Sequence, residues 1–137
     1  MGLDDARIQG FLATKEVAVL ATVQADGSPL AMAMWLLHAP ASLTMISVAD
    51  TQKVRNLRRD PRVSVVAEAV TAGGEIRGVA VQGRAEFLPD GPERRALIDR
   101  FHEKYRGLQR LWNGKAMPAN RVMFTIVPSR VRSWGLE

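Results

Sequence analysis

The sequence predicts a mainly β (α+β) fold, in which an antiparallel barrel of about six strands carries two or three peripheral helices. Short β-branched and apolar runs recur along the chain, and turn residues separate them. Few segments have helical periodicity, too few to supply the crossovers of a parallel sheet. Barrel closure would also protect the strand edges. A chain of 137 residues has room for one core, so we expect residues 1–137 to form one domain.

The first fifty residues predict a short helix followed by an antiparallel meander. Apolar side chains at helical spacing indicate the helix over residues 4–14. Two β-branched runs, Val17–Val23 and Pro29–Leu37, flank an Asp-Gly pair that is typical of a hairpin turn. A further run at Ser42–Val48 follows a proline and extends the hairpin to three strands.

The middle of the chain predicts one short helix and two strands. Residues 50–60 are polar, rich in helix formers and followed by a proline, which ends a helix. The side chain of Asp50 or Thr51 is expected to cap its start. Strands are predicted at Arg62–Val70 and at Ile76–Leu88, on either side of a Gly-Gly turn.

The C-terminal part predicts the longest helix and the last strand. Asp90–Tyr105 combines an early proline with apolar residues at four-residue spacing, which favours a helix. Residues 107–120 lack periodicity and predict an ordered loop. A strand is predicted at Arg121–Val127, after which Pro128 is expected to turn the chain into a short segment at Val131–Trp134.

Composition excludes several kinds of chemistry. The chain contains no cysteine, so disulfides, thiolate nucleophiles and cysteine-ligated metals are excluded. His38 and His102 are its only histidines and lie far apart, so we expect no metal site. No side chain is a compelling acid or base, and the catalytic residues stay unknown. Acidic residues near the amino terminus and the lack of a long apolar run predict a cytoplasmic protein without a membrane span.

The charge balance points to an anionic partner. The formal net charge is +5, the pI is about 10.4, and fifteen arginines accompany four lysines. Nucleic acid, a phosphorylated cofactor and an acidic small molecule all fit, as does a merely solvated surface. Arg55, Arg58, Arg59 and Arg62 favour nucleic acid, but no aromatic residue interleaves with them, so we expect nucleic acid least.

The start of the helix predicted after residue 50 is the best candidate for an anion site. Thr51, Gln52 and Lys53 would lie in its first turn, where backbone N–H groups, a hydroxyl and an ammonium suit a phosphate. Asn56 would share a face with Lys53. The alternative is a surface helix whose basic side chains are only solvated.

Five segments in this sequence occur in the order found in one known family. They are Ala25-Asp26-Gly27-Ser28-Pro29, Met34-Trp35, Lys53-x-x-Asn56-Leu57-x-x-Asp60-Pro61-x-Val63, Val81-Gln82-Gly83-x-Ala85 and Pro128-x-Arg130-Val131-x-x-Trp134. In this order they resemble the flavin-binding split β-barrel proteins related to pyridoxamine 5′-phosphate oxidase. The resemblance covers nearly the whole chain, and the Lys-x-x-Asn-Leu-x-x-Asp-Pro segment is its most specific part.

The resemblance implies a homodimer with two cofactor sites at the subunit interface, each holding FMN or the deazaflavin coenzyme F-420. The residues that it assigns to the cofactor phosphate are Ser47, Thr51, Gln52 and Lys53, with Asn56 beside them. Those that it places under the ring are Met32, Ala33, Met34 and Trp35. The other subunit would contribute Arg77, Gly78 and Trp134.

One departure from the family bears on the substrate. The oxidase that names the family carries Arg-x-x-x-Leu-Lys on its second strand, whereas residues 30–37 read Leu-Ala-Met-Ala-Met-Trp-Leu-Leu and contain no base. The sequence more closely resembles the actinobacterial branch that uses F-420, whose lactyl-oligoglutamate tail is polyanionic. We therefore expect an oxidoreductase that transfers a hydride between cofactor and a small conjugated molecule rather than pyridoxamine phosphate. A cofactor carrier or storage protein without turnover is the alternative.

Three further side chains have two possible roles each. Trp112, with its neighbours Leu108 and Leu111, would either cover the substrate or pack beneath a long loop. His38 is expected to be a turn residue rather than a proton donor. His102 is expected on the surface or in packing.

Overall fold

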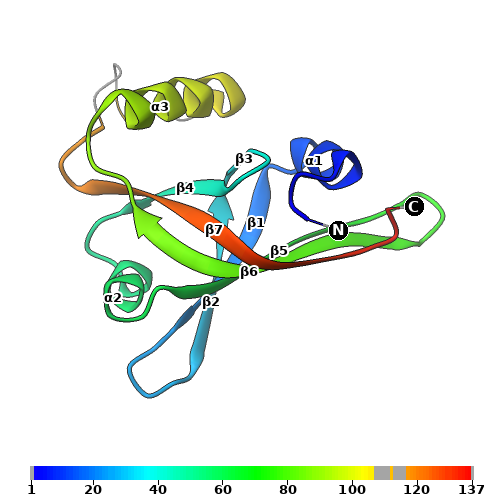
Figure 1. Cartoon of the computed structure of the whole chain (residues 1–137), viewed down its shortest axis with the longest axis horizontal. Helices are drawn as coiled ribbons and strands as arrows, with labels where there is room; N and C mark the ends of the chain where they lie inside the picture. The colour runs from blue at the N-terminus through cyan, green and yellow to red at the C-terminus, as the bar shows by residue number, and fades with distance from the viewer. Residues whose placement is uncertain (1, 107–111, 113–116, 137) are drawn as a thin grey trace.

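The computed structural model describes residues 2–106, 112 and 117–136, and its strands form one antiparallel sheet in the order β2-β1-β5-β6-β7-β4-β3 (Figure 1). The elements are α1 (Ala6–Ala13), β1 (Val17–Val23), β2 (Pro29–Trp35), β3 (Leu37–His38), β4 (Leu43–Val48), α2 (Gln52–Arg59), β5 (Arg62–Val70), β6 (Ile76–Phe87), α3 (Pro92–Lys104) and β7 (Arg121–Trp134). The sheet curls into a half-barrel with β2 and β3 at its edges. The predicted mainly β class is confirmed.

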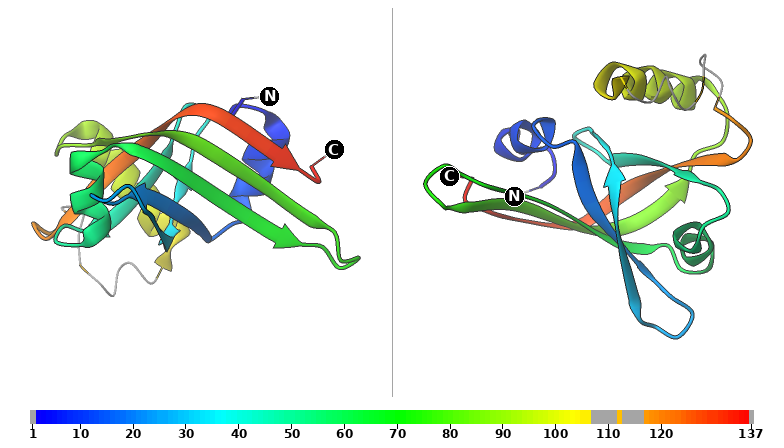
Figure 2. Two further views of the ribbon diagram at one scale, coloured as in Figure 1. Left: turned by 90° about the horizontal axis from the view of Figure 1, so that it is seen from below. Right: turned by 180° about the vertical axis from the view of Figure 1, so that it is seen from behind.

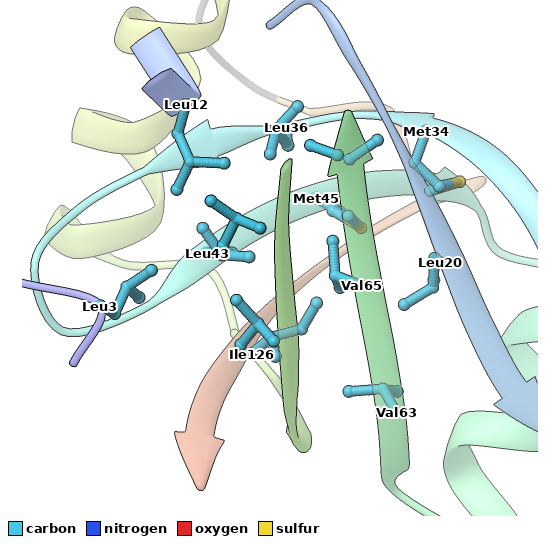
Figure 3. Packing of buried hydrophobic residues seen from close by; sticks show 14 of the residues in the cluster. Leu3, Leu12, Leu20, Met34, Leu36, Leu43, Met45, Val63, Val65 and Ile126 are labelled. Carbon is cyan, nitrogen blue, oxygen red and sulfur yellow. The ribbon is translucent and has the colours of Figure 1, made fainter. Parts of the chain in front are cut away.

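The main apolar core fills the inside of the curled sheet, as Figure 3 shows. Side chains from α1, β1, β4, β5 and β7 meet there, and alternate residues of β5 face it. Val63, Val65 and Ala67 are buried, whereas Ser64 and Val66 between them are not. A second cluster lies under α3 around Ile98 and Phe101. Leu37 and Met123 belong to this second cluster, whereas their neighbours Leu36 and Phe124 belong to the main core, so α3 covers the outer face of the sheet at β3, β4 and β7.

The predicted meander of the first fifty residues is interrupted at Leu36. β4 pairs with β7 and with the two-residue β3, while β2 pairs with β1. The Leu36 N–H donates to the Tyr105 hydroxyl (3.0 Å), and the Leu36 carbonyl accepts from Lys104 Nζ (2.8 Å). Because side chains at the end of α3 satisfy this backbone, the extended run breaks into β2 and β3.

The predicted turn at Pro128 is wrong, because β7 continues through it. Gln82 pairs with Arg130 and Gly83 pairs with Pro128, so the β6–β7 ladder contains a bulge at this point. A bulge tolerates the missing N–H of proline. Gly83 allows the close approach, since an added Cβ would lie 2.1 Å from the Val127 carbonyl oxygen.

Two hairpins extend away from the half-barrel in different directions. Figures 1 and 2 show the β5–β6 hairpin running out beside the C-terminal end of β7, and the β1–β2 hairpin projecting on another side. Within the described segments, no helix is long and apolar enough to cross a membrane. Most of the loop predicted at 107–120, including Leu108 and Leu111, lies outside the described residues.

Candidate functional site

A cavity of about 310 Å³ lies where β2, β4, α2, α3 and the first residue of β7 meet. Its lining consists of Ala33, Met34, Trp35, Ile46, Ser47, Val48, Lys53, Phe101, Trp112 and Arg121. This volume is at the lower end of the ~300–1,000 Å³ typical of small-molecule sites. The lining is mostly apolar and aromatic, with a few polar groups, as such sites usually are.

The edge strand β2 supplies a flat apolar wall. Ala33 and Trp35 lie on one face of this strand and both are exposed, while Met34 between them is buried. The Trp35 ring stacks on Tyr105 with centroids 4.4 Å apart and planes 6° from parallel. The Tyr105 hydroxyl also donates to the Glu16 carbonyl (2.6 Å), so the ring behind Trp35 is fixed to the backbone. The wall is therefore suited to a planar ring.

Two cations face the cavity without an acidic partner. Neither the Lys53 nor the Arg121 side chain forms an ion pair with any described residue, and none of the lining residues is acidic. Lys53 is half-buried, and this burial lowers its pKa below the ordinary lysine value. Arg121 is the first residue of β7 and lies opposite Val48 in the ladder with β4. A negatively charged group in the cavity would relieve both uncompensated charges.

The start of α2 adds backbone donors beside Lys53. Thr51 is the N-cap residue, but its hydroxyl donates to the Val48 carbonyl (3.2 Å), and no side chain caps the helix. Asp50 pairs instead with Arg55 (2.7 Å). The expected side-chain cap from Asp50 or Thr51 is therefore wrong. Uncapped N–H groups at a helix start attract anions, as the sequence predicted for this corner.

The cavity brings together five of the residues that the sequence singled out, and four others lie nearby. Those five are Ala33, Met34, Trp35, Ser47 and Lys53. Met32, Thr51, Gln52 and Asn56 belong to the same part of the fold but not to the lining. Asn56 is fully buried, where its amide donates to Thr22 Oγ1 (3.0 Å) and accepts from Gln52 Nε2 (2.8 Å). Its contact with a cofactor stays a prediction.

The remaining three predicted residues lie together in another part of the sheet. Gly78 pairs with Trp134 across β6 and β7, and Arg77 precedes Gly78. The Trp134 ring covers Gly78 so closely that a Cβ there would lie 2.1 Å from a ring carbon. Within one protomer none of the three lines the cavity, and the sequence had assigned them to the site of a second subunit.

Four lining residues were not singled out for the site by the sequence: Ile46, Val48, Phe101 and Arg121. Ile46 and Val48 flank Ser47 at the end of β4, so the prediction of Ser47 could have been extended to both neighbours. Arg121 follows only from the register of β7 with β4. Trp112 is buried, lines the cavity and meets the His102 ring edge-on at 5.8 Å, so it both packs and bounds the site.

Comparisons with known proteins bear on the family and the fold of this chain. The family model described as pyridoxamine 5'-phosphate oxidase matches residues 4–135. A conserved hypothetical protein from Mycobacterium tuberculosis is 31% identical, with a TM-score of 0.80 over 95% of this chain and 83% of that one. An FAD-binding protein from Mesorhizobium loti is 29% identical, with a TM-score of 0.73 over 89% of this chain and 86% of that one. The heme storage protein HutZ from Vibrio cholerae, at 17% identity and a TM-score of 0.80 over 99% and 97%, shares the fold.

Proposed function

The chain belongs to the pyridoxamine 5′-phosphate oxidase family, and from this premise we propose that it is an oxidoreductase that binds FMN or coenzyme F-420. The single observation that carries the proposal is the cavity in which unpaired Lys53 lies beside the flat wall of β2. The FAD-binding protein from Mesorhizobium loti, at 29% identity, supports a flavin-type ligand.

The residues present fit both parts of such a cofactor. Lys53, the uncapped start of α2 and the Ser47 hydroxyl would hold the phosphate, while Ala33 and Trp35 would lie against the ring. The bound ring would supply hydride transfer to or from a small conjugated substrate. Phe101 and Trp112, which are both buried, would keep water from the ring. Arg121 offers a second positive charge, which would suit the polyanionic tail of F-420.

We also propose that two copies of the chain complete the site. The outer face of the sheet is apolar and exposed, because Val17 and Val19 of β1 pair with Trp35 and Ala33 of β2 on that face. Exposed apolar patches of this kind are typical of protein interfaces. A second copy on this face would cover Trp35 and supply Arg77, Gly78 and Trp134 to the site.

Cofactor titration with matched ligands tests the assignment of Lys53. Lys53→Ala should weaken FMN binding by roughly tenfold to a hundredfold, because one charged hydrogen bond is worth about 1.5–3 kcal/mol. Riboflavin, which lacks the phosphate, should lose little affinity. The control Arg55→Ala removes a paired charge from the same helix and should leave both affinities nearly unchanged. Equal losses for FMN and riboflavin, or no fluorescence change with micromolar FMN or F-420, would refute the proposal.

Sedimentation tests the second copy. Val19→Glu places a charge in the middle of the outer face and should convert a dimer to a monomer, because an unpaired buried charge is costly. Val127→Glu is the matched control, since Val127 is exposed to a similar degree, at 43% against 37%, but pairs with Arg84. A monomeric wild-type protein, or equal effects of both variants, would contradict the proposed dimer.

A carrier without turnover is the second candidate, and one observation favours it. None of the cavity residues that the structure describes is a histidine or a carboxylate. Reduced cofactor should be reoxidised faster by a quinone or a nitroaromatic acceptor when the protein is present. Unchanged reoxidation across such a panel, with tight cofactor binding, would establish the carrier instead.

A further inference from the structure

We propose that a second cavity, which is separate from the cofactor site, binds a small organic anion through Arg58 and Arg94. This cavity has a volume of about 240 Å³ and lies between the end of α2, the end of β6, α3 and the start of β7. Its lining consists of Arg58, Phe87, Leu88, Pro89, Arg94, Val122 and Met123. Two arginines therefore line an otherwise apolar hollow.

Neither guanidinium is neutralised by the fold. Arg58 and Arg94 form no ion pair or side-chain hydrogen bond with a described residue. The Arg94 Nε atom is buried and has no hydrogen-bond partner. A buried N–H group without an acceptor is energetically costly, so the fold does not satisfy this arginine. Arg58 is held over the Phe87 ring, 4.2 Å from its centroid.

Asp90 does not neutralise Arg94 by direct pairing. Asp90 lies within electrostatic range of Arg94, but its carboxylate accepts a hydrogen bond from Arg95 at 3.3 Å. The Leu88 N–H beside the cavity is also satisfied, since it donates to the Met123 carbonyl (2.9 Å). Among the described lining residues the two arginines carry the only side-chain donors, and their planar forks suit a carboxylate or a phosphate.

The apolar lining indicates that the ligand has an apolar part as well as an anionic group. Phe87, Leu88, Pro89, Val122 and Met123 contribute no polar side chain, so an inorganic ion would leave these walls without a partner. The volume lies below the ~300–1,000 Å³ typical of drug-sized ligands. The ligand class is therefore a small carboxylate or phosphate with a compact apolar body. Arg121 lines the cofactor cavity, whereas the next two residues of β7 line this one, so β7 separates the two sites.

Nuclear magnetic resonance of the arginine Nε–H groups tests the site in the full-length protein. Benzoate is the probe, and benzamide is its neutral control of the same shape. Benzoate should shift the Arg58 and Arg94 Nε–H signals in a saturable way, and benzamide should not. Arg94→Gln should weaken benzoate binding by roughly tenfold or more, the loss expected for one charged hydrogen bond. Arg84→Gln, which changes an exposed arginine outside the cavity, should leave the affinity unchanged.

A second variant and a competition separate this site from a general charge effect. Arg94→Lys keeps the charge but loses the planar fork, so it should also weaken benzoate. FMN bound in the other cavity should leave the Arg94 signal and the benzoate affinity unchanged. Non-saturating shifts, equal shifts at Arg84, full affinity in Arg94→Gln, or displacement of benzoate by FMN would each overturn the proposal.

Discussion

Two basic residues near opposite ends of α2 differ in whether they form an ion pair. At its start, Lys53 lines the cavity without an acidic partner, and burial lowers its pKa. After its end, Arg62 donates to both oxygens of Asp60, at 3.0 Å and 2.7 Å, and lowers the pKa of that carboxyl to about 2. The Asp60–Arg62 ion pair thus lies where the chain turns into β5, whereas Lys53 is unpaired where a ligand is expected. Unpaired charge, rather than charge as such, distinguishes the site.

The largest expected effect concerns Asn56, which lies between these two ends. Asn56→Ala removes the amide that bonds Thr22 and Gln52 in a fully buried position, so the free energy of unfolding should fall by about 2–4 kcal/mol. Urea denaturation would measure this change. Such a result would show that Asn56 holds the fold together through its paired amide.

Arg55→Ala is the control for this variant, because Arg55 lies on the same helix and its ion pair with Asp50 is exposed, so its removal should cost less than about 1 kcal/mol. A large loss of FMN affinity in Asn56→Ala, with unchanged stability, would instead assign Asn56 to the cofactor, as the sequence proposed.

Tyr105→Phe should have the next largest effect, because the polar groups behind the apolar wall of the cavity are paired through the Tyr105 hydroxyl. The variant keeps the ring behind Trp35 but leaves the buried Leu36 N–H without its acceptor. An unmet buried donor costs about 1–3 kcal/mol of unfolding free energy, which thermal or urea denaturation would detect.

The control for Tyr105→Phe is Ser129→Ala, which loses an exposed hydroxyl bonded to the Gln82 carbonyl and should change stability by less than about 0.5 kcal/mol. Equal losses in the two variants would show that the Tyr105 hydroxyl is not a buried anchor of the wall.

The sequence predicted local features well and long-range pairing poorly. The β-branched runs that became β1, β5 and β6 were found because alternation is a local signal. The break at Leu36 depends on Tyr105, which lies 69 positions away in the sequence. The bulge that carries β7 through Pro128 depends on its pairing with β6. No local pattern encodes either contact.

The residues of the candidate site also fall into those that the sequence could predict and those that depend on long-range pairing. Lys53 was predicted from its place at the start of a helix, and Trp35 from the resemblance to the flavin-binding family. Arg121 was missed because only the register of β7 against β4 brings it to Val48 and thus into the cavity. The sequence considered Arg58 only in a basic run that favours nucleic acid and did not single out Arg94, because only the fold brings the two around one hollow.

The smallest expected effect is a change in the pH dependence of stability at the Asp60–Arg62 ion pair, which follows α2. Asp60 has a pKa of about 2 in the folded protein, below its ordinary value of 3.8. Its contribution to stability is therefore fully present above the ordinary value and is lost as the pH falls through the folded value. Arg62→Gln should return the Asp60 pKa toward 3.8, as a carboxyl-detected titration would show. The stability difference between wild type and variant should then shrink as the pH approaches 2.

Lys53→Gln completes this last experiment, because it removes a charge from the unpaired end of the same helix. If Asp60 is held by its direct hydrogen bonds with Arg62, its pKa should be the same in Lys53→Gln and in wild type. A rise of the Asp60 pKa in Lys53→Gln as large as that in Arg62→Gln would mean that the basic field of the whole helix, rather than local pairing, sets the carboxyl. In that case the charge of Lys53 would already interact with Asp60, and the lack of an ion pair at Lys53 would not identify a ligand site.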